Sequence, residues 1–186
     1  MGKVIASMAM SLDGYIAKKD GDTASLNNAM SPEEDYGFAD FMSKIGAYIL
    51  GANTYREITK SGVAGGDNQV STYVVSHQTD LKLGKNTYLY SGDLAELVKK
   101  IQTETEKDIW LFGGGDLTTQ FINLNLVDEL AIAIIPVLIG GDVPFFGNVV
   151  EYKNLILLES KTYEKSGIVA LTYGFKKAKR NRKNKK

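Results

Sequence analysis

Two segments of this chain carry glycine where a predicted buried strand leads into a predicted helix. A helix N-terminus offers unpaired backbone N–H groups and the positive end of the helix dipole, and both favour phosphate groups. Glycine lets the backbone come close to such a ligand. The chemistry indicated is the binding of a dinucleotide through its phosphates, by Gly51, Ala52, Asn53 and Thr54 in one segment and by Gly113, Gly114, Gly115, Asp116, Leu117 and Thr118 in the other.

The two segments indicate a bound ligand with different strength, and neither matches a standard nucleotide-binding motif. Three consecutive glycines lose much conformational entropy on folding and have no side chains to pack, which favours a ligand at residues 113–115. Gly51 alone fits an ordinary tight connection equally well. No Gly-Lys-Ser/Thr follows either segment, which excludes a P-loop. The Rossmann dinucleotide fingerprint also fails, because Thr118 occupies its third small position and the glycine run comes late in the chain.

Hydrophobic patterning predicts strands that alternate with helices and a hairpin at the end. The strands are expected at 4–10, 15–17, 47–50, 70–76, 87–90, 108–112, 129–135, 155–164 and 168–176. A helix is expected to open at Ser31, which suits a cap and precedes a proline, and others are expected at 53–59, 93–105 and 117–125. We therefore predict an α/β fold, a single three-layer αβα domain over residues 1–176 with a central, mostly parallel mixed sheet and an antiparallel C-terminal hairpin.

The composition narrows the classes of protein that fit this chain. It has no cysteine, which excludes disulfides and thiolate chemistry, and one histidine with scattered acids offers no metal site. No apolar stretch reaches the ~20 residues of a membrane span, so we expect a cytoplasmic protein. Residues 177–186 form a basic tail that we expect to be disordered. Without the last eleven residues the chain has 14 basic and 22 acidic residues, which argues against nucleic-acid binding.

Four motifs resemble the dihydrofolate-reductase-like superfamily. They are SLDGYIA at 11–17, LGANTY at 50–55, FGGGD at 112–116 followed by LVDEL at 126–130, and PVLIGGDVPFF at 136–146. Their order and rough spacing are most similar to the reductase domain of the bifunctional riboflavin-biosynthesis deaminase/reductase, in a stand-alone form. The resemblance covers about residues 3–176, and it is more specific for fold and cofactor than for substrate.

The resemblance implies NADPH as the cofactor, bound across the carboxyl ends of the strands. The two glycine segments would hold its phosphates and nicotinamide, and the first peptide bond of the glycine run would be cis. Ser76 and His77 would lie near the 2′-phosphate, although His77 is also explained as a polar residue that follows a strand. Relatives usually carry arginine at the position of Ala52. Its absence removes a charge-assisted phosphate contact and leaves NADH open as the alternative.

Reduction by hydride transfer needs a proton donor, and two acids are candidates. Asp35 lies sixteen residues before Gly51, the spacing of the substrate-binding acid in the folate-reducing branch. On the predicted helix it shares a face with Phe38, so an aromatic wall would bury it and raise its pKa. An exposed acid in the first helical turn is the alternative. Asp13 belongs to an Asp-Gly turn, and the resemblance places this turn beside the nicotinamide.

Ser7, Phe38 and Ala133 are expected to border the substrate. The residue types at positions 7 and 133 leave its identity open. Ala133 replaces a threonine that bonds acid and pterin in the folate-reducing branch, and the riboflavin branch has a phosphate-binding lysine near Ser7. The leading hypothesis is an NAD(P)H-dependent reductase of a small pterin-like or pyrimidinone-like heterocycle, including the 5-amino-6-(5-phosphoribosylamino)uracil type. The alternatives are a nucleotide-binding protein without turnover and a true dihydrofolate reductase. The apolar stretch 127–138 and the usual assembly of the riboflavin-like branch predict a homodimer.

Overall fold

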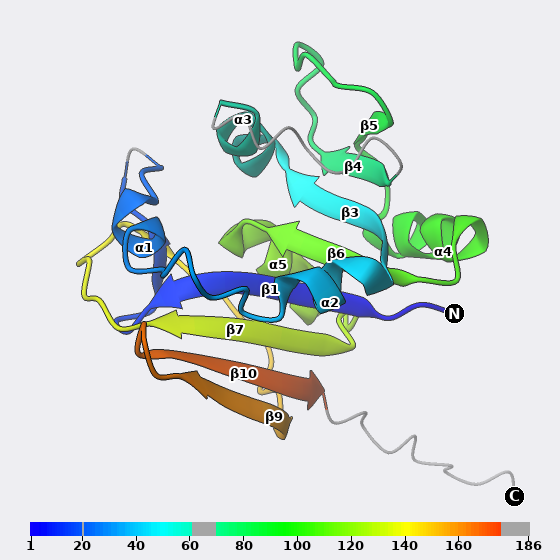
Figure 1. Ribbon diagram of the computed structural model, residues 1–186. Coiled ribbons are helices and arrows are strands. Elements are labelled where there is room, and N and C mark those ends of the chain that lie inside the picture. Colours follow the sequence, from blue (N-terminus) through cyan, green and yellow to red (C-terminus); the bar gives the residue numbers. More distant parts are fainter. Residues whose placement is uncertain (20, 61–69, 176–186) are drawn as a thin grey trace, which may run out of the picture.

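A sheet of eight strands runs through the middle of the protein (Figure 1). The computed structural model describes residues 1–19, 21–60 and 70–175. In their order across the sheet, the strands are β5 (Thr87–Tyr90), β4 (Ser71–Val75), β3 (Ile45–Gly51), β6 (Asp108–Gly113), β1 (Val4–Ser11), β7 (Glu129–Ile135), β10 (Ile168–Phe175) and β9 (Leu155–Tyr163). A two-stranded sheet pairs β2 (Tyr15–Ala17) with β8 (Val143–Pro144).

The strands from β5 to β7 pair in parallel, whereas the C-terminal hairpin is antiparallel. β1 pairs in parallel with both β6 and β7, and β3 does so with β4 and β6. β10 pairs antiparallel with β7 on one side and with β9 on the other. The central strands are apolar on both faces, as expected where helices cover both sides of a parallel sheet. The predicted mixed sheet with its antiparallel C-terminal hairpin is confirmed.

Helices cover both faces of this sheet and complete the three predicted layers. They are α1 (Ala24–Asn27), α2 (Phe38–Lys44), α3 (Ala52–Lys60), α4 (Leu94–Glu104) and α5 (Gly115–Asn123). α4 and α5 pack on one face, in a buried cluster that includes Phe121 and Leu111. α2 and α3 pack with Trp110 on the other face, where α1 also lies. Because side chains alternate along a strand, neighbours such as Trp110 and Leu111 reach opposite layers.

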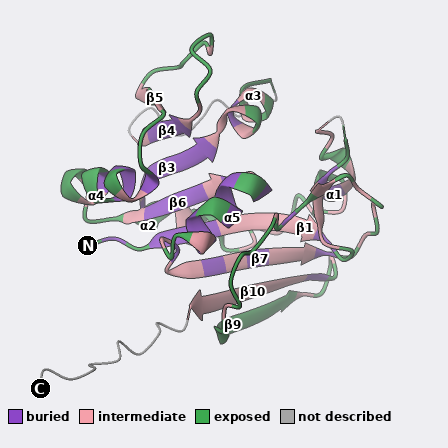
Figure 2. Ribbon diagram, turned by 180° about the vertical axis from the view of Figure 1, so that it is seen from behind, coloured by how far each residue is buried: buried purple, intermediate pink, exposed green. Residues whose placement is uncertain are grey.

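Burial is greatest in the middle of the sheet and least along its C-terminal edge (Figure 2). Ile49 of β3 and Leu111 of β6 are fully buried. In β9 every residue before Tyr163 is exposed. The sheet therefore ends in an edge strand that its own helices do not cover.

The region before α2 differs from the sequence-based expectation. The helix predicted to open at Ser31 begins at Phe38. Tyr36 and Gly37 have φ values of 56° and 76°, and residues in this left-handed region cannot belong to a right-handed helix. The Ser31 N–H instead donates to the Tyr36 hydroxyl at 2.8 Å. Asp35 therefore shares no helical face with Phe38, and that prediction was wrong.

The other predicted elements lie within a few residues of their expected bounds. One difference bears on the site, because α5 begins at Gly115 and not at Leu117, so the glycine run itself starts the helix. The sequence patterns predicted neither α1 nor β8. The tail expected at 177–186 lies outside the described residues. None of the helices that the structure describes is long and apolar enough to cross a membrane.

Candidate active site

The two glycine-containing turns lie next to each other at one edge of the sheet. β3 and β6 are parallel neighbours, and Leu50 pairs with Gly113, so both strands end at this edge. A methyl group on Gly51 would lie 3.8 Å from the Gly113 carbonyl oxygen, and one on Gly114 would lie 3.4 Å from Thr54 Oγ1. The N-termini of α3 and α5 therefore open side by side, which suits a ligand with two phosphate groups.

Backbone geometry and packing explain why two positions of the run are glycine. Gly113 has a φ of 107°, which residues with a side chain rarely adopt. Its peptide bond to Gly114 is cis, as the family resemblance implied. Gly115 packs against the segment around β8, where a methyl group would lie 2.5 Å from the Pro144 carbonyl oxygen and 2.7 Å from that of Phe145. α5 can approach this segment closely only because residue 115 has no side chain.

The start of α5 leaves several polar groups available to a ligand. Gly114 is the N-cap and has no side chain to accept hydrogen bonds from the first N–H groups of the helix. The Thr118 hydroxyl is buried and has no hydrogen-bond partner among the described residues. This hydroxyl is fully buried, so the donors that a ligand can reach are the N–H groups of the helix. N–H and O–H donors are the groups that phosphate oxygens accept from.

One cleft brings together most of the predicted cofactor-binding residues. Its volume is about 2440 Å³, above the roughly 300–1,000 Å³ of a pocket for one drug-sized ligand. Gly113 and Thr118 are buried and lie outside its lining. The predicted residues that line it are Gly51, Ala52, Asn53, Thr54, Ser76, His77, Gly114, Gly115, Asp116 and Leu117.

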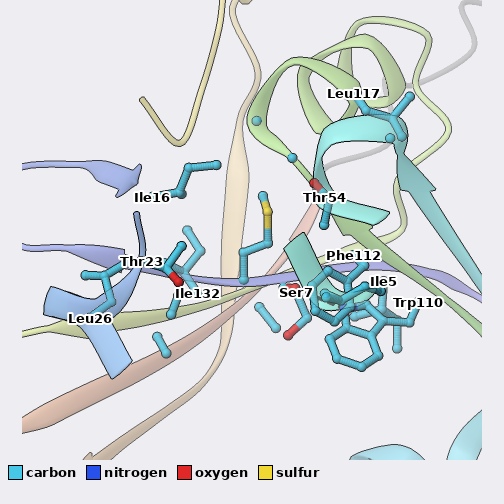
Figure 3. A pocket seen from close by; sticks show the side chains of 18 of the residues that line it. Ile5, Ser7, Ile16, Thr23, Leu26, Thr54, Trp110, Phe112, Leu117 and Ile132 are labelled. Carbon is cyan, nitrogen blue, oxygen red and sulfur yellow. Dashed lines mark hydrogen bonds between the residues drawn. The ribbon is translucent and has the colours of Figure 1, made fainter. Parts of the chain in front are cut away.

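Aromatic side chains form one wall of the cleft (Figure 3). The Trp110 indole N–H donates to the Ser7 carbonyl oxygen at 3.0 Å, which orients the ring. Figure 3 shows Trp110 and Phe112 beside Ser7, with Thr54 above them. The rings that contact Trp110 are Phe38 at 6.0 Å, Phe41 at 5.1 Å, Tyr48 at 5.7 Å and Phe112 at 4.4 Å between centroids. We call the four that line the cleft, Phe38, Phe41, Trp110 and Phe112, the aromatic wall.

Small side chains form the sheet surface beside the aromatic wall. Ile5 pairs with Trp110 in parallel register, so Ser7 and Ala9 of β1 lie on the same face as the wall. Ala9 pairs with Ala133 of β7, and all three small residues line the cleft. The predicted substrate-bordering residues Ser7, Phe38 and Ala133 are thus brought together. This surface carries neither a cation at residue 7 nor a hydroxyl at residue 133.

Asp35 lines the cleft but is exposed to solvent. Its Oδ2 accepts from the Ala39 N–H at 3.2 Å, so the carboxylate binds the first turn of α2. The expectation that the aromatic wall buries it was wrong, because the non-helical segment before α2 leaves this side chain in water. Phe38 itself is 52% exposed and reaches Trp110 from the first residue of the helix.

Asp13 lies in the turn after β1 and binds a loop that is distant in sequence. Its Oδ2 accepts from the Gly140 N–H at 2.8 Å and its Oδ1 from the Ile139 N–H at 3.3 Å. The Ser11 hydroxyl and these N–H groups lower the pKa of the Asp13 carboxyl, because they stabilise its charged form. Asp13 lies outside the cleft lining and is ionised at neutral pH, so it has no proton to donate there.

Glu34 is a candidate residue that the sequence analysis missed. It lines the cleft, and its Oε2 is buried with no hydrogen-bond partner among the described residues. Burying a carboxylate oxygen without a partner is costly, so the site favours a ligand that donates a hydrogen bond to it. In the sequence Glu34 stands beside Asp35 in an acidic stretch that has no periodic pattern. No sequence signal distinguishes its buried oxygen from the exposed carboxylates around it.

Ser76 and His77 follow β4 at the same edge of the sheet as the glycine turns. Val75 pairs with Gly51, which brings the end of β4 next to the start of α3. Ser76 Oγ accepts from the Gln78 N–H at 3.0 Å, and His77 is exposed. Within residues 1–19, 21–60 and 70–175, no group of three or more His, Asp or Glu side chains could hold a metal ion.

The three-layer fold with its mixed sheet matches that of solved structures in the dihydrofolate-reductase-like class. The dihydrofolate reductase of Enterococcus faecalis, in a structure with NADP(H), matches with a TM-score of 0.62 at 16% identity, over 94% of this chain and 96% of that one. The diaminohydroxyphosphoribosylaminopyrimidine deaminase/5-amino-6-(5-phosphoribosylamino)uracil reductase of Thermotoga maritima matches with a TM-score of 0.70 at 12% identity. That match covers 94% of this chain and 57% of the longer protein.

The chain belongs to the RibD C-terminal domain family, whose model matches residues 2–169. It is 31% identical over 182 residues to the "Uncharacterized protein YyaP" of Bacillus subtilis (strain 168), covering 92% of this chain and 94% of that one. The structure of the "Putative riboflavin biosynthesis protein" of Shewanella sp. PV-4 has a TM-score of 0.81 at 27% identity and covers 94% and 99% of the two chains. The resemblance inferred from the four motifs is confirmed.

Replacing Gly115 with alanine is expected to destabilise the fold, because the new methyl group meets the carbonyl oxygens of Pro144 and Phe145. Overpacking of this kind lowers the free energy of unfolding by about 1–3 kcal/mol. Gly51→Ala is the matched control, since its methyl group has an ordinary 3.8 Å contact. We expect that control to change the free energy by less than about 0.5 kcal/mol. Urea denaturation measures both variants, and equal stabilities would contradict the packing described for Gly115.

Proposed function

We propose that this chain is an NAD(P)H-dependent reductase that acts on a small heterocycle of the pterin or pyrimidinone kind. The observation that carries the proposal is the pair of helix N-termini, α3 and α5, which open side by side into one cleft. Family membership supports the same activity, and the related fold of Enterococcus faecalis dihydrofolate reductase is seen with NADP(H). When bound, a reduced nicotinamide supplies the hydride. The protein therefore has to bind and orient the cofactor and the substrate and to supply a proton.

The residues present fit a dinucleotide. The first N–H groups of α5 are uncapped by any side chain. Gly114 leaves open the space between Thr54 and Ile16, where a larger side chain would project. Phosphate oxygens accept from such donors, and the absence of a side chain at residue 114 lets a ligand approach the backbone. The remaining length of the cleft holds the second reactant.

The aromatic wall supports a planar heterocycle as that second reactant. Phe38 is 52% exposed although it lies against Trp110, so a flat ring can cover it and bury further apolar area. The small side chains of Ser7, Ala9 and Ala133 leave room for the ring against the sheet. Ala133 offers no hydroxyl to a pterin, which argues against a dedicated dihydrofolate reductase. The uncharged Ser7 offers no cation to a ribose phosphate.

The proton that accompanies the hydride has to come from a group near the substrate, and we assign this role to Glu34. A hydride adds to an unsaturated carbon, and the neighbouring nitrogen or oxygen takes up the proton. Glu34 lines the cleft with a buried, unpaired oxygen among the described residues. Asp35 is exposed and binds the start of α2, and Asp13 binds Gly140 outside the cleft lining. Asp35 therefore serves as the natural comparison.

Purified protein mixed with NADPH and a series of acceptors tests the activity. We expect NADPH absorbance to fall with dihydropterin or pyrimidinone acceptors and not without them. Glu34→Gln is expected to lower kcat by about 100-fold or more, whereas Asp35→Asn changes it by less than about threefold. A melting temperature that rises with NADPH, without oxidation by any acceptor, would instead favour a nucleotide-binding protein without turnover. Full activity in Glu34→Gln would remove Glu34 from the mechanism and leave the reductase assignment standing.

We also propose that the protein forms a homodimer through β9, with a second copy of this chain as the occupant of its open edge. Four consecutive apolar residues of this strand are 40–53% exposed, namely Leu155, Ile156, Leu157 and Leu158. An apolar edge strand with unpaired backbone groups promotes association unless a partner covers it. The exposed stretch continues the same sheet as β7, whose apolar pattern suggested a dimer from the sequence.

Replacing Leu157 with lysine is expected to dissociate the dimer, because it places a charge in the centre of the apolar stretch. Tyr152→Lys is the control, since Tyr152 is 89% exposed and precedes the strand. Light scattering after size exclusion should give about twice the 20.4 kDa chain mass for the wild type and Tyr152→Lys, and the chain mass for Leu157→Lys. A monomeric wild type at micromolar concentration would contradict the proposal.

A further inference from the structure

Arg56 is a cation in the cleft whose partners are all neutral. Its guanidinium donates to Asn53 Oδ1 at 3.0 Å and to Gln78 Oε1. No carboxylate of the described residues forms an ion pair with it. Two lysines of the same cleft are neutralised, Lys3 by Glu129 and Lys44 by Asp40, each at 2.6 Å. Arg56 therefore presents an uncompensated charge to whatever occupies its part of the cleft.

Arg56 connects two elements that line the cleft, namely α3 and the segment after β4. It follows Ala52 by four residues on α3, so the two side chains lie on the same face of the helix. Its contact with Gln78 spans from α3 to the segment after β4. Ser76 and His77 line the cleft in that same segment. A guanidinium, a hydroxyl and an imidazole are thus gathered in one region, and all three bind phosphate.

The charge of the cleft restricts where a dianionic group can bind. Its lining contains more acidic than basic side chains, so a phosphate monoester placed at random meets repulsion. At Arg56 the same group gains a bidentate, charge-assisted contact. To make that contact Arg56 gives up only hydrogen bonds to two side-chain amides, which water or phosphate can replace. A phosphate monoester next to Arg56 therefore gains a contact that offsets this repulsion.

We propose that Arg56 binds the 2′-phosphate of the cofactor and makes this protein select NADPH over NADH. This inference rests on the proposed function, and it resolves the alternative that the uncharged Ala52 left open. The charge absent from residue 52 is supplied one helical turn later. Arg56 acts in specificity and not in the hydride step, so its removal changes the choice of nucleotide more than the capacity to bind one.

Calorimetric titration with 2′,5′-ADP and with 5′-AMP tests this assignment without any need for a substrate. The two probes differ only in the ribose 2′-phosphate. We expect the wild type to bind 2′,5′-ADP at least about tenfold more tightly, as one charge-assisted contact predicts. Arg56→Gln should weaken the binding of 2′,5′-ADP by about 10–100-fold, leave the binding of 5′-AMP within about twofold, and so abolish the preference. Lys60→Gln, on the same helix and paired with Glu57, is the control and should keep the wild-type ratio.

Arg56→Lys provides a second variant that keeps the charge and loses the planar fork, and it should retain part of the preference. Melting temperatures of the variants verify that each is folded. Equal binding of both probes by the wild type, or an unchanged ratio in folded Arg56→Gln, would overturn the role of Arg56 and leave the reductase proposal intact. A wild type that binds neither probe nor NADPH would instead overturn the proposed function itself.

Discussion

Parallel pairing of β3 with β6 brings Gly51 and Gly113 to the same edge of the sheet, in a register that joins Leu50 to Gly113. Because each strand leads directly into a helix, the N-termini of α3 and α5 must open beside each other. The cis peptide and positive φ at Gly113, and the close packing of Gly115 against Pro144, belong to this arrangement. The cleft and its supply of backbone N–H groups depend on this pairing, and the other site residues are added around it.

The cleft contains four kinds of interacting group. The uncapped N–H groups of α5 suit phosphates, and the aromatic wall around Trp110 suits a flat ring. Arg56 adds a positive charge to a cleft whose lining contains more acidic than basic side chains. Glu34 brings a buried carboxyl oxygen that has no partner among the described residues. Each group has a different task, so each variant should change a different measured quantity.

The sequence was most informative where function and fold require the same residue type. Alternating apolar segments predicted the layers, and the glycine run predicted the turn, because few alternatives to glycine are compatible with Gly113 and Gly115. The start of α2 was mispredicted because Ser31 and the following proline suit the start of a helix. Tyr36 adopts a left-handed conformation, which no local sequence pattern predicts. The role proposed for Arg56 depends on its contact with Gln78, and that of Glu34 depends on burial in an irregular segment. Hydrophobic periodicity predicts neither feature.

Hydrogen exchange measured with and without NADPH tests the central claim most directly, which is that both glycine turns bind one dinucleotide. Amides that donate to phosphate or are covered by the cofactor exchange more slowly. The account predicts slower exchange at residues 51–54 and 114–118 together, with little change in the hairpin of β9 and β10. Protection at only one of the two turns, or at neither while NADPH is bound, would contradict it.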